Sequence, residues 1–164
     1  MSHDMPSRRR DLLAAAVVFG GLAPSVARGA PAAVDQRTSL HQQVGYPVAP
    51  RRIYETLLSS KDFAAFSGLP AKIDPRVGGG FQMFRGQIEG VIVELVPDAR
   101  IVQAWRPVGD FAPGVFTLVR FALAKAGSGT KVTLDQTGIP PGHYGHLASG
   151  WYANYWTPLK KVLT

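Results

Sequence analysis

Apolar and polar residues alternate along much of the middle of the chain, a pattern typical of strands that face a core on one side only. The alternation is clearest in residues 115–124. The residues on its apolar face are Val115, Thr117, Val119, Phe121 and Leu123. Similar patterns, separated by glycine and proline, predict strands at residues 39–48, 71–73, 81–86, 87–96, 100–106 and 131–136.

Apolar residues recur at helical spacing in three other segments. Two short helices are predicted after the first strand, at residues 51–58 and 61–66, with Pro50 at a position that the first turn of a helix tolerates. The third helix runs from residue 143 or 144 to residue 163, and we expect it to bend near Pro158.

This order of elements predicts an α+β fold. A sheet has one face to cover, and only the C-terminal helix is long enough to cover it. We expect a curved antiparallel sheet wrapped around that helix, with a ligand cavity between them. The residues predicted to face this cavity are Phe81, Glu94, Trp105, Phe121, Leu147, Trp151 and Tyr155.

Residues 1–32 have the pattern of an export signal. A basic segment at residues 7–13 precedes an apolar stretch at residues 12–22, which is too short to span a bilayer. Arg9-Arg10 followed by Leu12-Leu13 resembles the twin-arginine signal, although arginine-rich starts also serve the general secretory route. A basic disordered N-terminus followed by a short core helix is the alternative interpretation.

Small residues follow the apolar stretch, and we expect cleavage between Gly29 and Ala33. Residues 33–38 are then predicted to be a polar tether, and residues 39–164 to be the exported domain. The Tat or Sec machinery would carry the protein to the periplasm or an equivalent compartment. The mature form is expected to have no transmembrane segment.

Composition narrows the classes of function. The net charge is +7, but the basic residues are scattered and form no stripe interleaved with stacking aromatics, so nucleic-acid binding is not expected. The chain has no cysteine, which excludes disulfides, thiol catalysis and thiolate metal sites. The domain must therefore be held together by its core alone.

Few residues suggest reaction chemistry. Strand alternation places Glu94 on the face of Ile92 and Val96, where it could be a buried acid with a raised pKa, or it could stand in solvent. Arg120 could be its partner, could anchor an anionic head group of a ligand, or could stand on the solvent face of the sheet. His143 and His146 are too few for a zinc site, so no metal is expected. Nucleophile-elbow, phosphate-loop and dinucleotide motifs are missing, and no catalytic residue or cofactor is predicted.

Several motifs resemble the helix-grip superfamily abbreviated SRPBCC, which includes START lipid-transfer domains, polyketide cyclases and Bet v-type allergens. Within it, the chain is most similar to the activator-of-heat-shock-protein-90-ATPase-like branch. The motifs lie at residues 48–54, 74–81, 90–97, 129–134 and 146–151, and at Trp105. They are mostly structural, so the resemblance implies a cavity-bearing domain and carries over no catalytic residue.

Three functions are consistent with these features. The first is an exported module that binds a small hydrophobic or amphipathic ligand of the lipid, quinone or aromatic type. The second is a cyclase- or dehydratase-like enzyme that uses Glu94 or a histidine as acid and base. The third, implied by the branch, is a co-chaperone-like interaction module, and the export signal argues against it because the periplasm lacks ATP.

Overall fold

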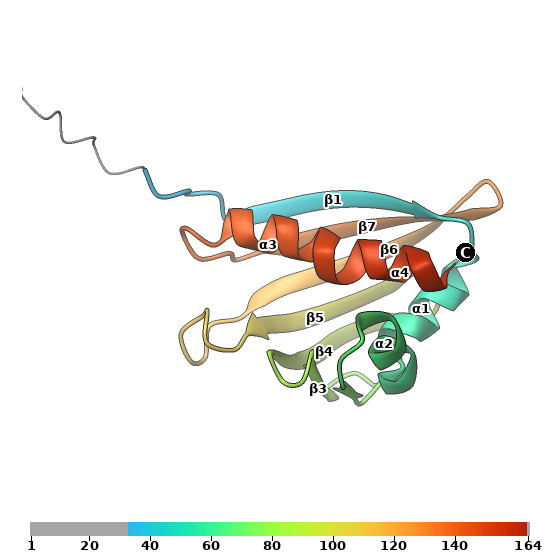
Figure 1. The fold of residues 1–164 in the computed structure, drawn as a ribbon, viewed down its shortest axis with the longest axis horizontal. Helices are drawn as coiled ribbons and strands as arrows, with labels where there is room; N and C mark the ends of the chain where they lie inside the picture. The colour runs from blue at the N-terminus through green and yellow to red at the C-terminus, as the bar shows by residue number, and fades with distance from the viewer. Residues whose placement is uncertain (1–32, 164) are drawn as a thin grey trace, which may run out of the picture. The chain divides into compact units, whose positions relative to one another are not determined.

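Residues 33–163 are described by a computed structural model, in which one antiparallel sheet curves around the C-terminal helix (Figure 1). The seven strands lie in the order β1-β7-β6-β5-β4-β3-β2, and every neighbouring pair is antiparallel. The strands are β1 (Ser39–Tyr46), β2 (Lys72–Ile73), β3 (Gly80–Met83), β4 (Ile88–Val96), β5 (Arg100–Pro107), β6 (Thr117–Ala126) and β7 (Gly129–Thr137). The predicted fold class is confirmed.

Buried and exposed residues alternate along the strands, so the sheet has an inner face and an outer face. In β1 and β6, buried and exposed residues alternate strictly over most of the strand, because successive side chains point to opposite faces. The inner apolar residues of β6 are Val119, Phe121 and Leu123, and each is less than 9% exposed. Val115, predicted to continue this row, precedes the strand and is 38% exposed.

The two short helices follow β1 as predicted. Helix α1 spans Pro50–Leu58 and α2 spans Ser60–Ser67. The Ser59 hydroxyl caps α2 by accepting a hydrogen bond from the Asp62 amide at 3.1 Å. Gly68 ends α2 in the left-handed region (φ 71°), where glycine has no Cβ to clash. Both helices lie near the C-terminal end of the long helix, and α2 contacts it (Figure 1).

The C-terminal helix has three consecutive parts, α3 (Tyr144–Trp151), a π-helical turn η1 (Tyr152–Trp156) and α4 (Thr157–Val162). In the π turn, the Thr157 amide donates to the Tyr152 carbonyl, five residues back. Pro158 has no amide hydrogen to continue the α-helical pattern, which explains why the wider turn sits just before it. The irregularity expected near Pro158 is therefore a π turn.

A β-bulge interrupts the pairing of β4 with β5. Ile92 pairs with Gln103 and Glu94 pairs with Val102, so Val93 is an extra residue on β4. The glycine-rich segment before β3 lies against this point, because the Gly78 amide donates to the Ile92 carbonyl at 2.8 Å. The Ile92 amide in turn donates to the Gly79 carbonyl at 2.9 Å. The bulge reverses the side-chain alternation after Ile92.

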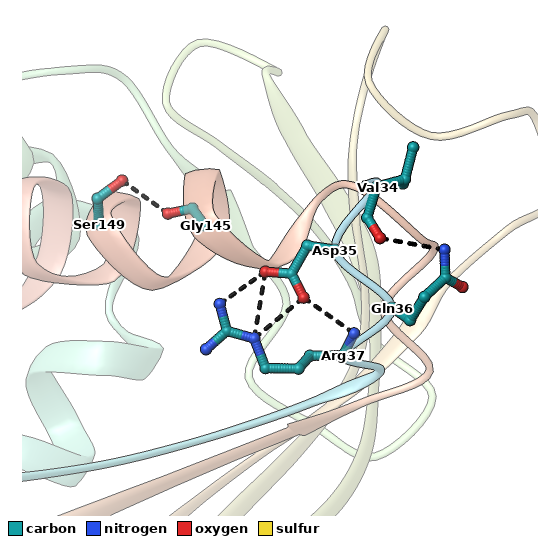
Figure 2. Close-up of polar contacts among 6 residues, drawn as sticks. All are labelled: Val34, Asp35, Gln36, Arg37, Gly145 and Ser149. Carbon is teal, nitrogen blue, oxygen red and sulfur yellow. Dashed lines mark hydrogen bonds and ion pairs between the residues drawn. The ribbon is translucent and has the colours of Figure 1, made fainter. Parts of the chain in front are cut away.

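Residues 33–38 pair with the loop that leads from β7 into the C-terminal helix. The Gly142 amide donates to the Asp35 carbonyl at 2.8 Å, and the Ile139 amide donates to the Thr38 carbonyl at 3.0 Å. Figure 2 shows the Asp35 carboxylate accepting hydrogen bonds from the Arg37 guanidinium, the shortest at 2.6 Å. The predicted signal, residues 1–32, lies outside the described residues. Within residues 33–163, no helix is long and apolar enough to cross a membrane.

Candidate functional site

A cavity of about 360 Å³ lies between the C-terminal helix and the β4–β5 part of the sheet. This volume falls at the small end of the range for small-molecule pockets. The wall is made by the inner side of the helix, the turn between β3 and β4, and the loop after β5. Its residues are Leu69, Phe84, Gln87, Ile88, Trp105, Pro107, Val108, Asp110, His146, Leu147, Gly150, Trp151, Asn154 and Tyr155.

Aromatic rings form the inner wall of the cavity. Trp105 of the sheet stacks on Trp151 of the helix, with ring centroids 5.4 Å apart and an interplanar angle of 30°. Tyr155 lies one helical turn from Trp151, at 4.4 Å, and meets the edge of Phe84 at 5.3 Å. All four residues are less than 9% exposed. A flat apolar ligand would find ring faces and edges on more than one side.

Buried glutamines fix the helix on the sheet. The Trp151 indole donates to the Gln136 side-chain carbonyl at 2.8 Å, and the Gln136 amide donates to the Thr117 hydroxyl at 2.9 Å. In the same way, the Trp156 indole donates to Gln42 at 2.6 Å. Buried polar groups need such partners. These bonds therefore set the position of the aromatic wall, and sequence reasoning did not select either glutamine.

The Trp105 indole is different, because its buried Nε1–H has no hydrogen-bond partner of good geometry. It faces the Tyr155 hydroxyl, which instead donates weakly to the Met83 sulfur at 3.8 Å. Burial raises the pKa of Tyr155, and the nearby indole opposes this shift only in part. Tyr155 is therefore a neutral hydroxyl at the inner end of the cavity, and it carries no charge there.

An unusual turn brings Phe84 into the cavity wall. Phe84 and Arg85 both have positive φ, at 52° and 59°, which is uncommon for residues other than glycine. The Arg85 amide donates to the Pro70 carbonyl at 2.8 Å, and the Gly86 amide donates to the Met83 carbonyl at 3.1 Å. Residues 81–86 were predicted as one strand, but the strand ends at Met83 and this turn follows.

The mouth of the cavity is polar. His146 of α3 and Asp110 of the loop after β5 approach each other, with Nε2 and Oδ2 3.7 Å apart. Their side chains are 77% and 49% exposed, so the pair stands in solvent. Gln87 and Asn154 are also exposed wall residues. These four side chains, Gln87, Asp110, His146 and Asn154, form the rim of the cavity. The site is thus an apolar interior with a hydrogen-bonding rim.

Comparison with known proteins identifies the family. The model of the family described as Activator of Hsp90 ATPase homolog 1-like protein matches residues 47–164. The chain belongs to this family. The human Activator of 90 kDa heat shock protein ATPase homolog 1 is 29% identical over 118 residues, covering 70% of this chain and 33% of the human protein. The chain spans about a third of the length of the curated relatives it matches.

Solved structures agree with the fold. An HSP90 activator from Plasmodium falciparum superposes with a TM-score of 0.73 at 24% identity, covering 77% of this chain and 96% of that chain. The Aha1 dimer from Colwellia psychrerythraea superposes with a TM-score of 0.65 at 18% identity, again covering 77% of this chain and 96% of that chain. These identities support the helix-grip fold of the activator family and nothing finer.

The structure brings together most of the residues predicted to face a cavity. Trp105, Leu147, Trp151 and Tyr155 lie in its wall. Phe121 is buried against Trp151, with ring centroids 5.7 Å apart, and lies outside the wall. Phe81 is also buried outside the wall, where its ring covers Gly90. Phe84, Asp110 and Asn154 are wall residues that sequence reasoning did not select.

Glu94 is placed differently from the prediction. The bulge at Val93 turns its side chain to the outer face of the sheet, where it is 44% exposed and forms two hydrogen bonds with Arg100, the shorter at 2.7 Å. These hydrogen bonds hold the pKa of Glu94 below its usual value, so of the two alternatives Glu94 is the solvent-facing acid and not the buried acid with a raised pKa. Arg120 is also on the outer face, 3.5 Å from Asp135. Glu94 therefore cannot serve a reaction inside the cavity.

His143 and His146, the two histidines considered as metal ligands, contact side chains of the loop after β5. His143 packs its ring against Phe111, with centroids 5.1 Å apart, and His146 faces Asp110. Among residues 33–163, no group of three or more histidine, aspartate or glutamate side chains is arranged to hold a metal ion.

Proposed function

We propose that this member of the activator family is an exported domain that binds a small, largely apolar molecule between its helix and its sheet. The observation that carries the proposal is the cavity of about 360 Å³, whose inner wall consists of aromatic and aliphatic side chains. Ligand pockets commonly combine such a wall with a few polar groups at defined positions. Export rests on the N-terminal pattern of the sequence.

Hydrogen bonds restrain the helix side of this cavity. Trp151 is tied to Gln136, and Trp156 is tied to Gln42, so rotation of either indole would leave a buried N–H without a partner. Residues of the inner wall also come from the sheet, from the helix and from the turn at Phe84. Closure would therefore need coordinated movement of three separate segments.

Membership of the activator family favours a second candidate, a protein-interaction module that acts on a chaperone ATPase. The curated relatives are named as activators of the 90 kDa heat shock protein ATPase. This chain matches only about a third of their length. The two candidates differ in compartment, because a cytoplasmic ATPase and an exported domain would not meet.

Native mass spectrometry of the protein, produced at full length in a host with both export routes and purified gently, tests the proposal. We expect a periplasmic species cleaved between Gly29 and Ala33 that carries a discrete added mass. A cytoplasmic, unprocessed protein that stimulates a chaperone ATPase would support the second candidate instead. An empty protein that gains no mass from lipid and quinone mixtures would refute ligand binding.

Two glycines of α3 provide matched variants. Gly150 lies in the cavity wall, and a Cβ added there would meet only the Asn154 side chain at 3.8 Å. Gly145 is exposed on the same helix with no heavy atom within 4 Å. Both substitutions replace glycine by a residue of higher helix propensity. Gly150→Leu should abolish the added mass, and Gly145→Leu should retain it.

A further inference from the structure

The cavity wall lacks the lysines and arginines that give the whole chain its positive charge. The chain carries a net charge of +7. None of the 14 residues in the cavity wall is a lysine or an arginine, and Asp110 is the wall's one carboxylate. At physiological salt, exposed charges are screened over about 8 Å. A bound molecule would therefore respond mainly to the local charges and little to the overall positive charge.

From this arrangement we propose that the cavity selects an uncharged amphipathic ligand and disfavours carboxylates such as fatty-acid anions. The proposal rests on the proposed function and specifies its ligand class. The ligand's apolar body would lie against Trp105 and Trp151, and a hydroxyl or carbonyl group would lie at the rim. There, the side-chain amides of Gln87 and Asn154 offer both donors and acceptors.

The inner end of the cavity favours the same ligand class. Tyr155 is 3% exposed, and burial raises its pKa, so the hydroxyl is neutral and provides no cation to pair with an anion. The Trp105 indole Nε1–H is also neutral. A carboxylate placed here would lose its hydration without gaining a positively charged partner, which is strongly unfavourable.

Arg85 is the basic residue that most directly challenges this reasoning. It lies in the turn between the wall residues Phe84 and Gln87, but its own side chain is exposed and is not part of the wall. The matched pair for testing charge is therefore Asp110→Asn and Asp110→Lys at the rim. Asp135→Asn on the outer face of the sheet is the control, because Asp135 contacts His41 and Arg120 there.

Two probes with the same apolar body test the proposal, 2-naphthalenemethanol and 2-naphthoate. Their affinities are measured by calorimetry at pH 8, where imidazole side chains are generally neutral, and at 150 mM salt. We expect the wild-type protein to bind the alcohol about tenfold more tightly. Asp110→Asn should reduce this preference about threefold, and Asp110→Lys about tenfold, mainly through tighter binding of the acid. Asp135→Asn should leave the preference for the alcohol unchanged.

The indole N–H signals of the three tryptophans, followed by NMR, show whether each probe enters the cavity. Any apolar cavity would favour the alcohol to some extent, so the response to Asp110 decides the question. Tighter binding of the acid, or equal effects of Asp110→Asn and Asp135→Asn, would overturn the inference while leaving ligand binding intact. Acid binding that is lost in Arg85→Ala would overturn it as well. Failure of both probes to bind would refute the proposed function together with the inference.

Discussion

Replacing Gln136 with methionine tests whether buried hydrogen bonds hold the helix on the sheet. Gln136 is 0% exposed, and its side-chain carbonyl accepts from the Trp151 indole at 2.8 Å. Methionine has nearly the same length and volume, so the substitution removes the acceptor without creating a large void. Trp151 is itself 2% exposed, which leaves its N–H without access to water.

The cost follows from that unpaired donor. A buried N–H without a partner costs about 1–3 kcal/mol. The Thr117 hydroxyl loses one bond as well but still donates to the Trp105 carbonyl at 2.9 Å, so it adds little. We expect the free energy of unfolding to fall by about 2 kcal/mol, which corresponds to roughly 6–10 °C in melting temperature for a domain of this size.

Urea denaturation measures this change, and an unchanged m-value would show that the shift in midpoint reports stability. Gln43→Met on the exposed face of β1 is the control, and it should alter stability by less than about 0.5 kcal/mol. In a Trp151→Phe background the donor is gone, so Gln136→Met should cost about 1 kcal/mol less than in the wild type. Equal costs in both backgrounds would refute a role for this hydrogen bond.

Three further predictions concern other parts of the fold. Gly90→Ala should destabilise by at least ~2 kcal/mol in urea denaturation, because its Cβ would collide with the Ala104 carbonyl, whereas Gly80→Ala in the paired strand should be nearly neutral. Ser59→Ala should cost about 1 kcal/mol through loss of the α2 cap, and a change below about 0.3 kcal/mol would contradict the capping role. Burial raises the pKa of Tyr155, so its contribution to stability is present below about pH 10 and is lost as pH rises further. Absorbance titration should show it ionising only with unfolding, and reversible ionisation near pH 10 in the folded protein would contradict this.

The sequence alone was sufficient to predict the order of the helices and strands and to identify most of the residues that face the core. Periodicity is a local property of the backbone, so alternation identified β6 and its inner residues, and helical spacing placed Trp151 and Tyr155 on one face. Proline and glycine marked the limits of α1 and α2 for equally local reasons. The general position of a cavity followed, because a single long helix must cover the inner face of the sheet.

Only the tertiary structure decided the details of the site. The bulge at Val93 depends on pairing with β5 and on the glycine segment that contacts Ile92, so no local pattern could show that Glu94 points outward. The polar rim joins Asp110 and His146, which are far apart in the sequence and meet because the loop after β5 lies beside α3. Register and long-range contact are properties of the assembled sheet and helix, and they determine which polar residues reach the cavity.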